Sequence, residues 1–101
     1  MGYLYLIIAI IGEVVGTLSL KSSNGFTVIT PSVLVIIGYG TAFYFMILSM
    51  KTIPVGITYA IWSGVGIAAV TFIASIKFGE KPDIFALVGL SFIIVGIIIL
   101  V

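Results

Sequence analysis

The sequence predicts an all-α integral membrane protein with four transmembrane helices in a single domain, residues 1–101. Of the residues, 62% are hydrophobic and only 7% are charged, and the mean hydropathy is +1.49. Soluble domains are nearer half apolar and a quarter charged, so this composition cannot cover a surface that faces water. Four hydrophobic runs, separated by short polar loops, make up almost the whole chain.

Each hydrophobic run is long enough to cross a bilayer as a helix. We expect spans at about residues 3–20, 31–50, 55–76 and 84–101. Each is about 18–22 residues long, and about 20 are needed to cross a hydrocarbon core of roughly 30 Å. The loops are so short that neighbouring helices must pack antiparallel. Because no water-soluble domain remains, any function must lie between the helices.

Polar and helix-breaking residues mark the ends of these runs. The first run ends at the polar segment 21–25, and the second begins at Pro31. Proline suits a first helical turn because its missing N–H needs no partner there. Pro54 separates the second run from the third, and the charged segment 77–83 separates the third from the fourth.

The composition also excludes several classes of function. The net charge is +1, and the chain has no Arg, His or Cys. This argues against a basic nucleic-acid surface and a histidine-based metal or acid–base site, and it excludes disulfides and thiolate chemistry. A lone membrane acid without metal ligands offers little chemistry to an enzyme. We therefore expect neither an enzyme nor a metal site.

Glu13 is the one charged residue placed inside a span, because the other six lie in loops. An ionised acid at that depth costs about 2.5–3.5 kcal/mol on insertion scales, less if it is protonated or lies beside a cation. Burial disfavours the ionised form, so Glu13 would be suited to exchange a proton for a cationic ligand. Alternatively, a protonated Glu13 serves only as a hydrogen bond between helices. We favour the functional interpretation, since intramembrane ionisable groups are functional by default.

Small side chains surround Glu13 on the first helix. Ala9, Gly16 and Thr17 lie three or four residues from it, as does Ile10. The small residues would either line a cavity that holds a ligand or let a neighbouring helix approach closely. The residues alone leave both interpretations open.

The third helix brings aromatic and polar residues to one face. These residues, at spacings i, i+3, i+4 and i+7, are Tyr59, Trp62, Ser63 and Gly66. A Trp face attracts cations and a Tyr hydroxyl can hold a carboxylate, although both residues also form belts at membrane interfaces. Gly64 and Gly66 form either a kink, as a moving gate would need, or a static packing notch.

The second helix adds two further aromatic residues. Tyr39, flanked by two glycines, is placed near the midplane, and Phe43 lies four residues on. Both are candidates to line the cavity, and packing between helices is the alternative.

The fourth helix carries a seam of near-heptad spacing, the pattern expected of helix pairing. The seam consists of Gly89, Phe92, Ile93 and Gly96. We interpret it as an oligomer interface, because one subunit of four helices can hardly surround a ligand path. Two subunits in opposite orientations would supply the inverted repeat that larger transporters build within one chain.

Lysine placement gives the chain only a weak preferred orientation. The side of the first and third loops carries Lys21, Lys77 and Lys81, and the other side carries Lys51. Since a bias of three against one is small, we expect that the chain can insert in both orientations.

These residues resemble the small multidrug resistance family over essentially the whole chain. The similarity covers Glu-Val-Val-Gly-Thr at 13–17, Lys21 with Ser-Asn-Gly-Phe-Thr at 23–27, and Pro-Ser at 31–32. It is most specific at 54–66, which reads Pro-x-Gly-x-x-Tyr-Ala-x-Trp-x-Gly-x-Gly. Gly16, where guanidinium exporters tend to carry an aromatic residue, and Ala42, where they tend to carry Ser, favour the quaternary ammonium and multidrug branch.

The resemblance implies an antiparallel homodimer, an eight-helix bundle in the bacterial inner (plasma) membrane that exchanges cations for protons. The two copies of Glu13 would bind protons and substrate in competition. The implied binding-site residues beside it are Tyr39, Tyr59, Trp62 and Ser63. Gly64 and Gly66 match the kink used in alternating access, and Gly89 and Gly96 match the dimerisation seam.

We therefore predict a proton-coupled antiporter that exports hydrophobic, quaternary ammonium or other polyaromatic cations. Its partners would be a second copy of the chain, the lipid bilayer and small organic cations, with protons as the coupling ion, no cofactor and no nucleic acid. Two alternatives stay open. One is an exporter of guanidinium or another small metabolic cation. The other is a non-transporting membrane assembly or regulatory subunit that uses Glu13 only for assembly.

Overall fold

The computed structural model describes all residues, Met1–Val101, and contains four α-helices. These are α1 (Gly2–Ser22), α2 (Ile29–Ser49), α3 (Val55–Lys77) and α4 (Ile84–Leu100). Their bounds lie within two residues of the ranges expected from the sequence. Helices α1, α2 and α3 are long and apolar enough to cross a membrane, and α4, with 17 residues, is shorter. The predicted all-α architecture of four helices is confirmed.

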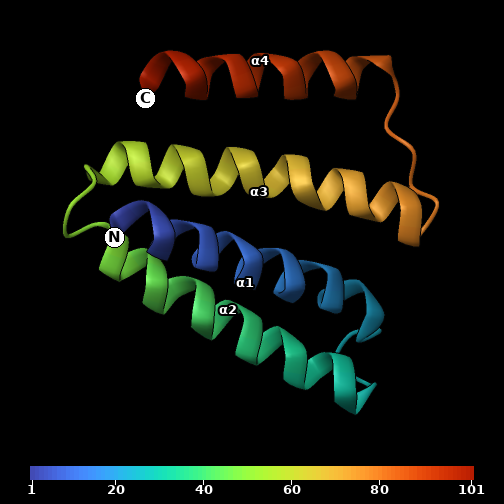
Figure 1. Cartoon of the computed structure of the whole chain (residues 1–101). Helices are drawn as coiled ribbons and strands as arrows, with labels where there is room; N and C mark the ends of the chain where they lie inside the picture. Colours follow the sequence, from blue (N-terminus) through green and yellow to red (C-terminus); the bar gives the residue numbers. More distant parts are fainter.

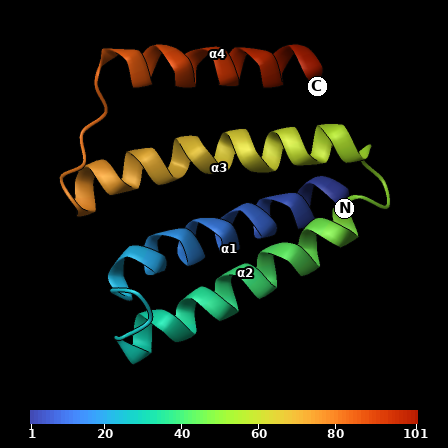
Figure 2. The same ribbon diagram turned by 180° about the vertical axis from the view of Figure 1, so that it is seen from behind.

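The four helices lie side by side in a single layer. Their order across the layer is α2, α1, α3, α4, and the view from behind agrees (Figures 1 and 2). The principal extents are 38 × 34 × 16 Å. A helix with its side chains is about 10–12 Å wide, so the chain is little more than one helix thick. Such a layer cannot enclose a ligand by itself.

The tightest packing joins α1 to α2, through small residues spaced four apart on each helix. A Cβ atom added to Gly12 would lie 2.7 Å from the carbonyl oxygen of Gly38 and 3.0 Å from the backbone nitrogen of Ala42. One added to Gly38 would lie 2.8 Å from the nitrogen of Gly16. Small residues at this spacing let two membrane helices approach backbone to backbone. This contact fixes the direction in which the neighbouring Glu13 can point.

Helix α4 is the least packed element, since it contains no buried residue. It begins at the N-cap Asp83, whose carboxylate accepts a hydrogen bond of 2.8 Å from the backbone N–H of Ala86. It contacts α3 at Gly64, where an added Cβ would meet the side chains of Ile93 and Ile97. Most of the α4 surface is therefore free for a further contact.

The segment between α3 and α4 folds back over the end of α3. Gly79 has a φ of +70°, a conformation that favours glycine. The turn lets the N–H of Glu80 donate a 3.3 Å hydrogen bond to the carbonyl oxygen of Ala74. This places Glu80 beside α3 and near the end of α1.

Candidate functional site

Glu13 projects from α1 toward α3, where it lies against Gly66. A Cβ atom added to Gly66 would fall 2.6 Å from the carboxyl carbon of Glu13. The carboxyl group thus occupies the space that a side chain at position 66 would need. Trp62 lies four residues before Gly66 and so shares its face of α3. The acid predicted from the sequence therefore faces the helix that carries the predicted aromatic residues.

Two polar atoms, one on α1 and one on α3, are buried without a hydrogen-bond partner in the chain. They are Oε2 of Glu13, an acceptor when ionised, and Nε1 of Trp62, a donor. A buried polar group without a partner costs about 1–3 kcal/mol, so native proteins rarely keep one without a reason. The chain thus leaves one acceptor of the membrane acid and one donor on α3 free to bind a ligand or a partner.

A row of four aromatic rings runs from α2 to α3 beside this contact. Tyr39 stacks on Phe43 with ring centroids 6.3 Å apart. Phe43 contacts Trp62 across the helices at 5.8 Å, and Trp62 contacts Tyr59 at 5.8 Å. The rings of Phe43 and Tyr59 are about half exposed. The row therefore offers open ring faces to whatever lies against this side of the layer.

The first ring of the row is fixed to α1. The hydroxyl groups of Tyr39 and Thr17 are hydrogen-bonded at 2.6 Å. The ring lies over Gly16, where an added Cβ would come within 3.1 Å of it. Gly16 is therefore the place where α1 makes room for the Tyr39 ring.

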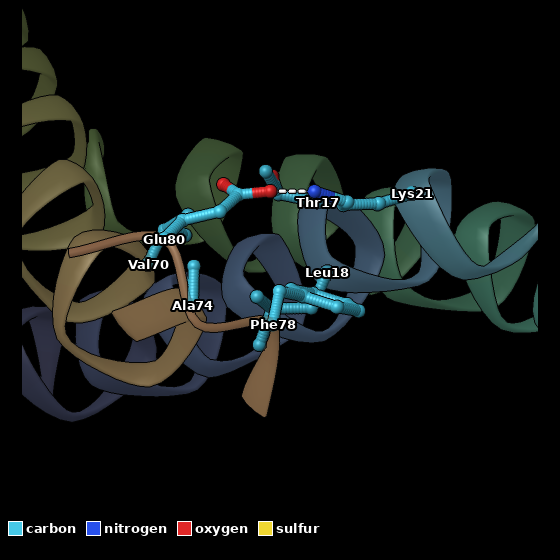
Figure 3. Close-up of a pocket in the computed structure, with 7 residues that line it drawn as sticks. All are labelled: Thr17, Leu18, Lys21, Val70, Ala74, Phe78 and Glu80. Carbon is cyan, nitrogen blue, oxygen red and sulfur yellow. Dashed lines mark ion pairs between the residues drawn. The ribbon is translucent and has the colours of Figure 1, made fainter. Parts of the chain in front are cut away.

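A cavity of about 200 Å³ opens between α1 and α3, starting one helical turn from Glu13 and Gly66. It is lined by Thr17, Leu18, Lys21, Val70, Ala74, Phe78 and Glu80 (Figure 3). Glu13 does not line it. The cavity runs from the level of Thr17 to the charged loop end of the helices.

Comparison with known proteins decides the family. The sequence matches the family model described as Small Multidrug Resistance protein over residues 1–93. The quaternary ammonium compound-resistance protein QacE of Escherichia coli is 52% identical over 99 residues, covering 98% of this chain and 90% of that protein. A putative ethidium bromide resistance protein of Salmonella typhimurium is 52% identical over 98 residues, covering 97% and 85%. QacC of Staphylococcus aureus is 44% identical over 98 residues, covering 97% and 92%.

The chain belongs to the small multidrug resistance family. It is accordingly a multi-pass membrane protein of a bacterial transporter family and not an enzyme. The resemblance stated from the motif at 54–66 is confirmed, and so is its placement near the quaternary ammonium and ethidium resistance proteins.

Other residues singled out in the sequence have varied surroundings in this small multidrug resistance protein. Ala9 is fully buried. The hydroxyl of Ser63 donates a 2.7 Å hydrogen bond to the carbonyl oxygen of Tyr59, one turn earlier in the same helix. Helix α3 continues without interruption through Gly64 and Gly66. Each of these two glycines allows a close approach, Gly64 to α4 and Gly66 to Glu13.

The predicted seam on α4 is only partly in contact with the rest of the chain. Gly89 and Gly96 have open space where a Cβ would lie, and Phe92 is 72% exposed. Ile93 instead faces α3 at Gly64. Within the chain, the two glycines and Phe92 thus have no packing role.

Sequence reasoning missed two features of the site region. The first is the packing of Gly12 against Gly38 and Ala42, which the spacing of four between Gly12 and Gly16 could have indicated. The second is the ion pair of Lys21 with Glu80, which no sequence signal links, because the residues are far apart in the chain.

Proposed function

We propose that this chain is a proton-coupled antiporter that exports quaternary ammonium and other hydrophobic aromatic cations. The observation that carries the proposal is the position of Glu13, the only charged side chain of the spans away from a helix end, against the α3 face that bears Trp62. A carboxylate supplies the counter-charge for a cation, and a ring face supplies cation–π attraction. The unpartnered Oε2 of Glu13 supports a ligand at this place.

Competition at one carboxyl group would couple the two ions. A protonated Glu13 has no charge with which to hold a cation, and a cation bound to ionised Glu13 disfavours protonation. Each ion therefore leaves when the other binds. A carboxyl group inside the membrane suits this exchange, because protonation and cation binding are the two ways to relieve the cost of its charge.

The site would be completed by a second copy of the chain in the opposite orientation. One subunit is 16 Å thick in its shortest direction, and the rings of Phe43 and Tyr59 remain half exposed. The unburied helix α4, with open space at Gly89 and Gly96, supports a contact between subunits there. An antiparallel pair would bring two copies of Glu13 to one chamber and allow it to open alternately to either side.

The relatives support the substrate class. Two of them are named for resistance to quaternary ammonium compounds and one for resistance to ethidium bromide. Quaternary ammonium ions and ethidium are permanent cations, and ethidium also has a flat aromatic system that can lie against the ring row. We therefore assign hydrophobic organic cations, rather than guanidinium, as the substrates.

Cation-induced proton release tests this function. When tetraphenylphosphonium is added to the detergent-solubilised protein in weak buffer, the wild type should release protons and Glu13→Gln should release none. Asp83→Asn is the matched control, since it removes one carboxylate but keeps a good N-cap, and it should behave as the wild type. A wild type that binds no cation and releases no proton would instead support a non-transporting subunit. Release with guanidinium alone would support the small-cation alternative.

A further inference from the structure

A charged and aromatic cluster closes the loop end of the cavity between α1 and α3. The ammonium group of Lys21, at the end of α1, forms an ion pair with the carboxylate of Glu80 (Figure 3). The same ammonium lies 5.0 Å from the centroid of the Phe78 ring. Glu80 and Phe78 belong to the segment between α3 and α4, so the cluster joins this segment to α1.

The surroundings of the Lys21 ammonium are those of an organic cation site. A carboxylate provides the opposite charge, and a ring centroid within about 6 Å provides cation–π attraction. Lys77 approaches the same ring, with its ammonium 5.5 Å from the centroid. The ammonium of Lys21 therefore occupies a position in which a cation contacts both Glu80 and Phe78.

The cavity beside the cluster can take the apolar part of such a cation. Its volume is about 200 Å³, and Leu18, Val70 and Ala74 are apolar residues of its lining. Pockets that enclose a whole drug-sized ligand are larger, about 300–1,000 Å³. The cavity therefore suits one ring or one substituent of a larger cation, which is enough for brief binding.

The cluster is open enough for exchange with solution. The side chains of Lys21 and Glu80 are 55% and 50% exposed. A solvent-exposed ion pair contributes little to stability, so another cation can replace Lys21 at small cost. The backbone of the segment is held by the turn at Gly79 and by the hydrogen bond from Glu80 to Ala74, so the segment needs no ordering before a ligand binds.

We propose that Glu80 and Phe78 form a second cation site at the mouth of this cavity, where a hydrophobic cation displaces the ammonium of Lys21 on its way to or from Glu13. The substrate class in this inference rests on the function proposed above. In the antiparallel dimer, one such site would lie at each face of the membrane. The site at one face would take up cations from solution, and the site at the opposite face would receive cations released from Glu13.

Ethidium binding to variants that lack the central acid tests the site. In a Glu13→Gln background, fluorescence anisotropy at low ionic strength should show weak residual binding above that of protein-free micelles. Adding Lys21→Gln removes the competing ammonium and should strengthen this binding about three- to tenfold, the range expected for one cation–π and ion-pair contact. Adding Glu80→Gln should abolish it.

Control substitutions that change the same charge in the same loop distinguish binding at this site from a general effect of surface charge. Lys81→Gln removes the same charge as Lys21→Gln, and Asp83→Asn removes the same charge as Glu80→Gln while keeping the N-cap of α4. Neither residue contacts the cluster through its side chain, so each control should change residual affinity by less than about twofold. With Glu13 intact, Glu80→Gln should slow ethidium association about threefold and leave the equilibrium affinity unchanged.

Different results would contradict the second cation site and the proposed role of Glu13. If Glu13→Gln with Lys21→Gln binds no ethidium above the micelle background, the second site does not exist, while the role of Glu13 stands. If Glu80→Gln and Asp83→Asn have equal effects, the cluster is not a site. If Glu13→Gln binds ethidium as tightly as the wild type, the proposed function fails instead, and loss of that binding in Glu80→Gln would still support the second site.

Discussion

Glu13 and Gly66 share one space between α1 and α3. The carboxyl carbon of Glu13 lies 2.6 Å from the point that a Cβ atom of residue 66 would occupy. Gly12 and Gly16 hold α1 closely against Gly38 of α2, which fixes the neighbouring side of α1. Position 66 must therefore remain without a side chain for the membrane acid to keep its place.

Gly66→Ala should displace the Glu13 carboxyl group and weaken cation binding about tenfold. The added methyl group overlaps the end of a flexible side chain and not the backbone, so we expect the protein to fold with a displaced acid. Overpacking of this kind costs about 1–3 kcal/mol. Gly40→Ala is the control, because nothing lies within 4 Å of its Cβ position. Equal dissociation constants for tetraphenylphosphonium in Gly66→Ala and the wild type would show that the contact has no role.

Trp62→Ala should weaken the binding of aromatic cations more than that of guanidinium. The substitution removes the ring that joins Phe43 to Tyr59 in the aromatic row. A cation–π contact is worth roughly 0.5–2 kcal/mol, or about two- to thirtyfold in affinity. Trp62→Phe keeps a ring face and should lose less. Titration calorimetry with tetraphenylphosphonium checks this, and unchanged affinity in Trp62→Ala would remove Trp62 from the site.

Gly89→Val combined with Gly96→Val should weaken the dimer without unfolding the subunit. Both positions are open in one chain, so only a partner would meet the new side chains. We expect at least about a tenfold rise in the dimer dissociation constant, from overpacking at two close contacts. Light scattering in detergent measures the mass. Ile98→Ala, on the opposite face of α4, should remain dimeric, and an equally dimeric double variant would place the interface elsewhere.

A reporter fused to the C-terminus should be found on both sides of the membrane. The side of Lys21, Lys77 and Lys81 exceeds the other by only two lysines, which is a weak bias. Adding two lysines to either side should fix one orientation. If the native chain reports only one side, dual insertion is wrong, and an antiparallel dimer would need an oppositely inserted partner.

The helices were predictable because membrane spans have a simple sequence signal. Apolar length and the breaks at Pro31, Pro54 and segment 77–83 placed every helix end within two residues. Glu13 was predictable as a site residue for the same reason, since a charge inside an apolar run is conspicuous. The order of the helices across the layer carries no such signal.

Contacts between distant segments were the part that the sequence left open. Small residues on α1 suggested either a cavity or close packing, and the structure shows Gly16 packed under the Tyr39 ring and Thr17 lining the cavity. The pairing of Lys21 with Glu80 depends on the turn at Gly79, which sets where the loop lies. The spacing of residues along one helix cannot predict such contacts, because they form only when α2 and α3 have packed against α1.

The pH dependence of cation affinity tests the central claim most directly. If protons and cations compete for Glu13, the carboxylate form binds the cation, and the affinity for tetraphenylphosphonium must rise as the pH rises and then level off once the acid is ionised. We predict a rise between pH 5 and 9, roughly tenfold per pH unit at its steepest for one exchanged proton, whereas Glu13→Gln should show only weak residual binding that does not rise in this way. Glu13→Asp should keep a pH-dependent curve that is displaced along the pH axis. A wild-type affinity that stays constant across this range, or tight binding by Glu13→Gln, would contradict the account.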